Sequence, residues 1–147
     1  MKQGIMLGVM GGVSILVVAI VFFAMRRRRP KELKSEQFQT KWQELQKMCA
    51  DKASWKKVVH DADHLLDEAL RKKRIRGKSM GERMVHAQRL FTNNDGVWFG
   101  HKLRNRVEAE PDMRLKEDDV KDALIGIRQG LKDLGALPET KKAGGKS

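Results

Sequence analysis

The sequence predicts an all-α protein with an N-terminal transmembrane helix followed by a four- to five-helix bundle. Three observations lead to this fold class. An apolar run occupies positions 4–25. From position 36 onward, apolar residues recur three or four positions apart, which is the period of an amphipathic helix. No segment shows the alternation of apolar and polar residues that is typical of a half-buried strand.

The apolar run at the N-terminus has the length of a membrane span. Its 22 residues cover about 33 Å at about 1.5 Å each, against a hydrocarbon core of about 30 Å. Four arginines follow it and only Lys2 precedes it, so the positive-inside rule places the N-terminus outside and the rest in the cytoplasm. We expect a single-pass protein of the cell membrane, with lipids as partners of Arg26, Arg27, Arg28 and Arg29.

Three glycines share one face of this expected anchor, namely Gly4, Gly8 and Gly12. Their spacing gives two overlapping small-xxx-small patterns, which let two membrane helices approach closely. The pattern favours a homodimer formed through this face. The alternative is that glycine is simply common in membrane helices, so the sequence leaves the oligomeric state open.

The chain divides by composition into four parts. We expect the anchor with its basic stop-transfer signal at 1–29, a linker at 30–35, a cytoplasmic helical bundle at 36–138 and a disordered basic tail at 139–147. Pro30 favours a break at the start of the linker. Short loops within the bundle favour antiparallel neighbours.

Five helices are expected within the bundle, each with an apolar stripe between turn signals. Ser35 and Ser79 are suitable N-caps, Asn93 to Gly96 form a turn, and Gly135 is suitable after the last helix. In chain order, the expected helices cover about 36–50, 54–74, a segment that begins at 79, 97–110 and 117–134.

The composition is strongly basic, with a formal net charge of +12, so a polyanionic partner is plausible. The densest cationic segment, 71–78, holds six positive charges in eight residues and is suited to phosphates or a membrane surface. The alternative is a solvated helix end, where cations interact favourably with the helix dipole. The cations of this basic run are Arg71, Lys72, Lys73, Arg74, Arg76 and Lys78.

A second group of polar residues lies on the fourth expected helix. Arg104 offers a planar fork to a phosphate, and Asn105 both donates and accepts hydrogen bonds. The alternative is that these groups pair with Asp63 or Asp67 inside the bundle. The candidate ligand-binding residues here are His101, Lys102, Arg104 and Asn105.

Little in the sequence indicates a metal or a cofactor. His60 and His64 have the i, i+4 spacing of a metal pair, but no third ligand follows at a recognised spacing. The single cysteine, Cys49, excludes both an internal disulfide and a cysteine zinc cluster. The chain lacks a glycine-rich phosphate loop and a nucleophile elbow. We therefore expect neither a metal nor a cofactor.

The polar group on the fourth expected helix resembles the signature of HEPN domains, a superfamily of helical bundles named for nucleotide binding. More closely, residues 36–135 resemble uncharacterised bacterial single-pass membrane proteins with a HEPN-like cytoplasmic helical domain. The residues that carry the resemblance are Trp55, Ala62-Asp63, Leu66-Asp67, Met80-Gly81-Glu82-Arg83, Trp98, His101-Lys102 and Arg104-Asn105.

Active HEPN domains resemble metal-independent ribonucleases that use an arginine, a polar residue and a histidine four to six residues after the arginine. Arg104 and Asn105 match the first part, but the position expected for the histidine holds Ala109, which cannot transfer a proton. We therefore expect a membrane-tethered, non-catalytic module that binds RNA, nucleotide or a protein partner. The alternatives are a HEPN-type ribonuclease that uses other residues, and a structural protein whose basic patches bind the bilayer.

Overall fold

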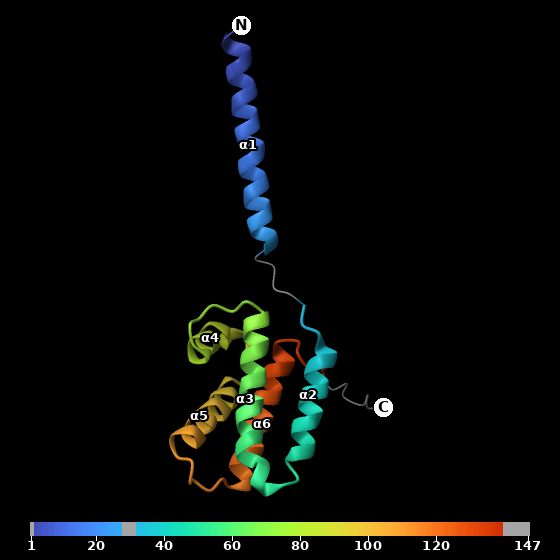
Figure 1. Cartoon of the computed structure of the whole chain (residues 1–147), viewed down its shortest axis with the longest axis vertical. Helices are drawn as coiled ribbons and strands as arrows, with labels where there is room; N and C mark the ends of the chain where they lie inside the picture. The colour runs from blue at the N-terminus through green and yellow to red at the C-terminus, as the bar shows by residue number, and fades with distance from the viewer. Residues whose placement is uncertain (1, 28–31, 140–147) are drawn as a thin grey trace, which may run out of the picture. The chain divides into compact units, whose positions relative to one another are not determined.

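The computed structural model describes the backbone of residues 2–27 and 32–139, and the side chains of residues 12–25 and 32–139. The chain divides into two compact units, Met1–Pro30 and Lys31–Ser147. Every regular element in the described part is helical, so the expected all-α class is confirmed. The helices are α1 (Lys2–Arg27), α2 (Ser35–Met48), α3 (Trp55–Lys72), α4 (Met80–Ala87), α5 (Asn94–Ala109) and α6 (Glu117–Asp133), as labelled in Figure 1.

The structure contradicts the predicted transmembrane helix. Among the described residues, no helix has both the length and the apolar character required to cross a membrane. The predictions of a single-pass membrane protein, with its N-terminus outside and its bundle in the cytoplasm, are corrected accordingly.

The remaining predictions for the N-terminal unit fall largely outside the described residues. At Gly12, a Cβ atom would meet nothing within 4 Å. The surroundings of Gly4 and Gly8, the side chains of Arg26 and Arg27, and all of Arg28 and Arg29 lie outside the described part, as does the predicted tail from residue 140 onward. A homodimer through the glycine face stays a prediction.

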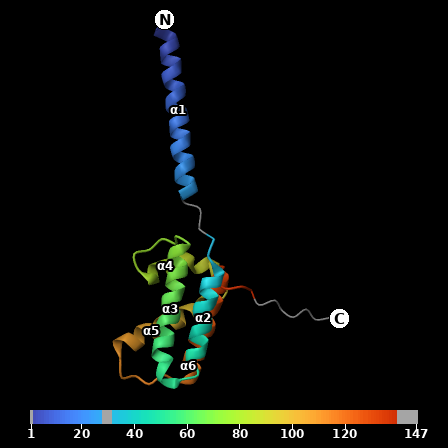
Figure 2. The ribbon, with the colours of Figure 1, turned by 45° about the vertical axis from the view of Figure 1, so that its right-hand side comes forward.

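In the second unit, α3 is the central helix. It packs against α2, α4, α5 and α6, and the views in Figures 1 and 2 show these helices gathered around it. Apolar residues three or four positions apart place a wide stripe of α3 in the core. The stripe consists of Val58, Val59, Ala62, Leu65, Leu66, Ala69 and Leu70, all of them buried.

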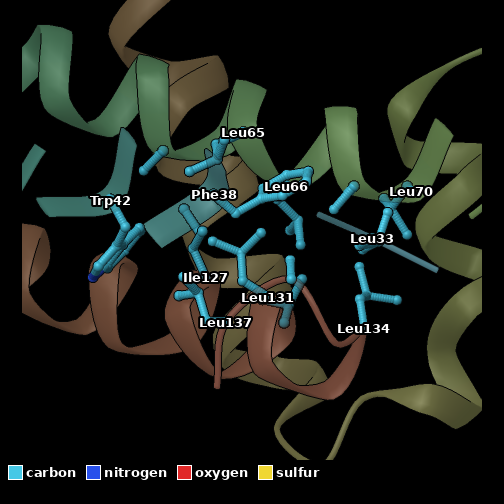
Figure 3. Packing of buried hydrophobic residues seen from close by; sticks show 14 of the residues in the cluster. Leu33, Phe38, Trp42, Leu65, Leu66, Leu70, Ile127, Leu131, Leu134 and Leu137 are labelled. Atoms are coloured by element: carbon cyan, nitrogen blue, oxygen red, sulfur yellow. The ribbon is translucent and has the colours of Figure 1, made fainter. Parts of the chain in front are cut away.

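Figure 3 shows how α2 and α6 cover this stripe. Leu66 and Leu70 of α3 face Leu131 of α6 and Leu134, the residue directly after this helix. Phe38 of α2 packs beside them. The fully buried leucines contribute about 1.5–3 kcal/mol each relative to an exposed side chain. The amphipathic pattern that predicted these helices is therefore the pattern that builds the core.

Turn residues fix the helix ends, with one correction. The Ser79 hydroxyl accepts a hydrogen bond from the Glu82 N–H at 3.2 Å, which confirms Ser79 as an N-cap. Gly135 has φ of 77°, the left-handed conformation that glycine tolerates after a helix. The prediction for Ser35 was wrong: it is the first residue of α2, and Lys34 occupies the N-cap position without a side-chain hydrogen bond.

Helices α5 and α6 pack closely through small residues. A Cβ atom on Gly126 would lie 2.1 Å from the carbonyl oxygen of Gly96, and one on Gly100 would lie 2.8 Å from the side chain of Ile127. Only glycine allows this approach of two backbones. The close packing holds the N-terminal half of α5 against the core and thereby fixes the direction of its polar face.

We expect Gly126→Ala to lower the free energy of unfolding by about 3 kcal/mol, because the added methyl group must push α5 away from α6. Gly81→Ala is the matched control, since its Cβ would make only an ordinary contact of 3.9 Å with Ser79. Urea unfolding of both variants measures the difference. Equal stability of the two variants would contradict the close approach of α5 and α6.

Candidate functional site

Two buried carboxylates on α3 organise the polar interior of the bundle. Asp63 and Asp67 are four residues apart and therefore lie on one face of the helix. Their side chains are only 1% and 9% exposed. Because an unpaired buried carboxylate costs several kcal/mol, each requires cationic partners from neighbouring helices.

Asp63 is paired with two residues of α5. His101 Nδ1 lies 3.1 Å from Asp63 Oδ2, and Arg104 Nε lies 3.6 Å from the same oxygen. The Arg104 guanidinium also reaches Glu108, with 3.3 Å between Nε and Oε1, and donates to the Asn105 side-chain oxygen at 3.0 Å. These contacts hold the polar face of α5 against α3.

Asp67 is shared by two arginines. Arg83 donates from Nε to Asp67 Oδ1 at 2.8 Å, and Arg71 donates from Nη2 to Asp67 Oδ2 at 2.6 Å. Arg83 is 11% exposed and also donates to the carbonyl oxygen of Gly77 at 2.9 Å. Arg83 lies in the first turns of α4 and contacts both Asp67 and Gly77. It therefore connects α3 with the start of α4 and with the loop between them.

The structure shows the pairing that the second alternative describes for the predicted group on α5. His101 is buried and Arg104 is only 26% exposed, and both are paired with Asp63. Asn105 is exposed, but its side chain contacts Arg104 and lies 3.4 Å from His101 Nε2. Lys102 is exposed as well, and unlike the other three predicted residues it makes no contact with this network. Three of the four residues therefore belong to a network within the bundle, and ligand binding by the group stays a prediction.

The geometry of His101 nonetheless has a chemical consequence. The contact with Asp63 through Nδ1 favours the tautomer that carries its proton there, so that Nε2 is the basic nitrogen. Nε2 lies near the Asn105 amide, and the edge of His101 meets the Trp98 ring at a centroid distance of 5.9 Å. A buried carboxylate that orients a histidine is the arrangement of an oriented general base.

The basic run at 71–78 divides into paired and unpaired cations. Arg71 is held by Asp67, and Lys72 lies 2.9 Å from Glu68. Burial opposes ionisation of Glu68, but hydrogen bonds from Lys41 and Lys72 outweigh it and hold the pKa of this carboxyl below its ordinary value. The side chains of the other four cations form no ion pair with a carboxylate among the described residues, although the backbone N–H of Lys78 donates to the Glu82 carboxylate at 2.7 Å. These four cations are Lys73, Arg74, Arg76 and Lys78.

The backbone helps to present these unpaired cations. Arg74 has φ of 58°, a left-handed conformation that is uncommon for a residue with a side chain. It lies two residues after the last residue of α3, Lys72, and turns the chain into the loop that leads to α4. Arg74, Arg76 and Lys78 are exposed in this loop. The loop is held in place by the hydrogen bond from Arg83 to the carbonyl oxygen of Gly77.

Sequence reasoning included the pairing of the α5 group with Asp63 or Asp67 as an alternative, but it missed the other residues that complete this network. Arg83 belonged to the residues that carry the HEPN resemblance, but no role was predicted for it. Glu108, which lies 3.5 Å from His60 Nε2 and 3.3 Å from Arg104 Nε, was not singled out as a partner of Arg104 either. The usable signal was the i, i+4 spacing of Asp63 and Asp67 within an otherwise apolar stripe, since such acids need partners from other helices.

Within the residues that the structure describes, no three histidine, cysteine, aspartate or glutamate side chains come together as a metal site. His60 instead contacts Asp61 at 3.2 Å and stacks on His64 with 6.4 Å between the ring centroids. Comparison of the chain with family models, with curated proteins and with solved structures gives no match. A function for this chain can therefore be inferred only from the geometry of its residues.

We expect Asp63→Ala to lower the free energy of unfolding by about 3–5 kcal/mol, because it leaves His101 and Arg104 without their buried acceptor. Asp61→Ala on the same helix removes a more exposed carboxylate paired with Lys57 and is expected to cost less than about 1 kcal/mol. Thermal unfolding of both variants tests this. A small loss for Asp63→Ala would contradict the structural role of the network.

Proposed function

We propose that the helical domain is a non-catalytic RNA-binding module that contacts the phosphate backbone through the basic run. The observation that carries the proposal is the set of four cations without carboxylate partners on the loop after α3. Cations that are not neutralised within the protein are free to replace the counterions of a nucleic acid.

The distribution of charge supports this assignment of the surface. Residues 32–139 carry 22 Lys and Arg against 19 Asp and Glu, a net charge of +3. The domain is therefore almost neutral with the six cations of the basic run included, and the high net charge of the chain comes mostly from residues outside 32–139. A local cluster on a nearly neutral domain favours a defined binding surface over general attraction to polyanions.

An aromatic pocket on α5 supports single-stranded RNA in particular. Asp95, Trp98, Phe99 and Lys102 line a surface pocket of about 570 Å³. Exposed aromatic rings stack on unpaired bases, while a nearby lysine attracts the backbone. A Cβ atom on Gly81 would lie 4.0 Å from the Trp98 ring, so the start of α4, which follows the basic run, contacts the residue that lines this pocket.

The absence of a motif histidine supports a non-catalytic role. Ala109 is the last residue of α5 and is exposed. The neighbouring Glu108 is engaged with Arg104 and His60. Binding without cleavage therefore accounts for the loop and the pocket without requiring a proton donor at this end of α5. The relationship to HEPN domains, which the sequence resembles, remains part of the proposal.

The test is binding of single-stranded RNA by the purified chain at several salt concentrations. Replacing Lys73, Arg74, Arg76 and Lys78 by glutamine should weaken binding and reduce the slope of log affinity against log salt by about 3, because about 0.7 counterion is released per phosphate contact. The matched control replaces four exposed cations elsewhere, Lys34, Lys47, Arg114 and Lys116. Equal slopes for the two variants would reject the basic run as the RNA surface.

A second candidate is a ribonuclease that uses the Asp63–His101 pair, and the orientation of His101 by a buried carboxylate favours it. We expect the chain to bind RNA and leave it intact, because Nε2 of His101 is engaged with Asn105 and His101 does not line the aromatic pocket. Gel analysis of the bound RNA measures this. Cleavage that His101→Gln abolishes, with binding retained, would establish the ribonuclease instead.

A further inference from the structure

A groove between α2 and α6 lies apart from the proposed RNA surface. Two adjoining pockets of about 180 and 370 Å³ form it, and both are lined by Trp42 and Gln46 of α2 and by Arg128 of α6. Figure 3 shows the Trp42 ring between α2 and α6, with its nitrogen at the edge of the ring that points away from Leu131. None of these residues was singled out for function by the sequence.

Two hydrogen-bond donors in this groove are buried without an acceptor. Trp42 is 6% exposed and its Nε1 has no partner, and Nε of Arg128 is likewise buried without one. By contrast, Trp55 Nε1 donates to the Cys49 carbonyl oxygen at 2.9 Å. Because buried donors are nearly always satisfied, two unsatisfied donors in one groove point to an oxygen-bearing ligand.

The charged and apolar residues of the groove indicate which class of ligand fits it. Residues 121, 124, 125 and 128 form one ridge of α6 at i, i+3, i+4 and i+7. Lys121 and Arg128 are cationic, and Leu124 and Ile125 are apolar, with Ile125 63% exposed. Acidic residues also lie nearby: Glu117 pairs with Lys121 at 3.0 Å, Asp118 interacts electrostatically with the same lysine, and Glu139 lies at the far end of the groove. Apolar and cationic residues on one ridge suit an acidic segment that also carries aliphatic side chains.

We propose that the α2–α6 groove docks an acidic and aliphatic segment of a protein partner. Oxygen atoms of that segment accept hydrogen bonds from Trp42 Nε1 and Arg128 Nε, and an aliphatic side chain covers Leu124 and Ile125. A nucleic acid fits less well, because it offers no aliphatic group to the exposed Ile125. This site does not depend on RNA binding, since it lies on α2 and α6 and shares no residue with the basic run.

The experiment uses the full chain and an array of synthetic peptides that combine glutamate with leucine in different registers. Each peptide is paired with a version that has glutamine in place of glutamate. We expect a subset of the acidic peptides to bind, and Trp42→Phe and Arg128→Gln each to weaken that binding about tenfold, the effect of one lost hydrogen bond to a charged group.

Trp55→Phe is the matched control, because it removes an indole N–H that already has an acceptor. It should leave peptide binding unchanged and lower the melting temperature. Trp42→Phe should weaken binding, and it should also lower the melting temperature, because it removes part of a buried ring from the core. Peptide binding by Trp42→Phe that equals the binding by the unchanged chain would overturn the proposal.

Three further outcomes would also overturn it. Acidic peptides that bind no better than their glutamine versions would remove the electrostatic basis of the site. Competition by single-stranded RNA would assign the groove to nucleic acid. A dimer that Trp42→Phe dissociates, seen by sedimentation, would show that a second copy of the chain occupies the groove.

Discussion

The buried Asp63 carboxylate is the constraint on which the arrangement of the bundle depends. It is wholly inaccessible on the central helix, and taking a carboxylate out of water costs several kcal/mol unless partners compensate. His101 and Arg104 supply those partners only if α5 lies across α3 with its polar face inward. The glycine contact between Gly96 and Gly126 permits this placement, because it lets α5 approach α6 closely enough to bring both residues within reach of Asp63.

A second buried carboxylate, one turn further along α3, explains how the exposed basic loop after this helix is held in place. Asp67 takes Arg83 from α4 and Arg71 from its own helix, and Arg83 extends to the Gly77 carbonyl oxygen. The loop is thus fixed at Gly77 from the inside, which leaves its remaining cations facing outward. Within the basic run, Arg71 and Lys72 form ion pairs with carboxylates of α3. The other four cations of the run form the candidate ligand surface.

The amphipathic pattern predicted the helices because burial of an apolar stripe is a local property of the sequence. Ser79 and Gly135 could be identified as helix boundaries for the same reason: their effects are confined to the adjoining turn. The pairings of Asp63 with His101 and of Asp67 with Arg83 span 38 and 16 residues, and no local rule selects them among the many charged residues. The unsatisfied indole N–H of Trp42 could not be predicted either, because Trp42 stands at the helical spacing of an ordinary core residue.

The network also changes what a substitution at the arginine–asparagine pair means. Arg104 contacts Asp63, Glu108 and Asn105, so its removal leaves a buried carboxylate with one partner fewer and weakens the α3–α5 contact. A loss of ligand binding in such a variant would have two indistinguishable causes. The cations at 73–78 have no such structural partner among the described residues, so binding measured there reports on the surface itself. In this chain, Arg104 and Asn105 belong to the network between α3 and α5, and the cations of the basic run without ion-pair partners among the described residues lie on the loop after α3.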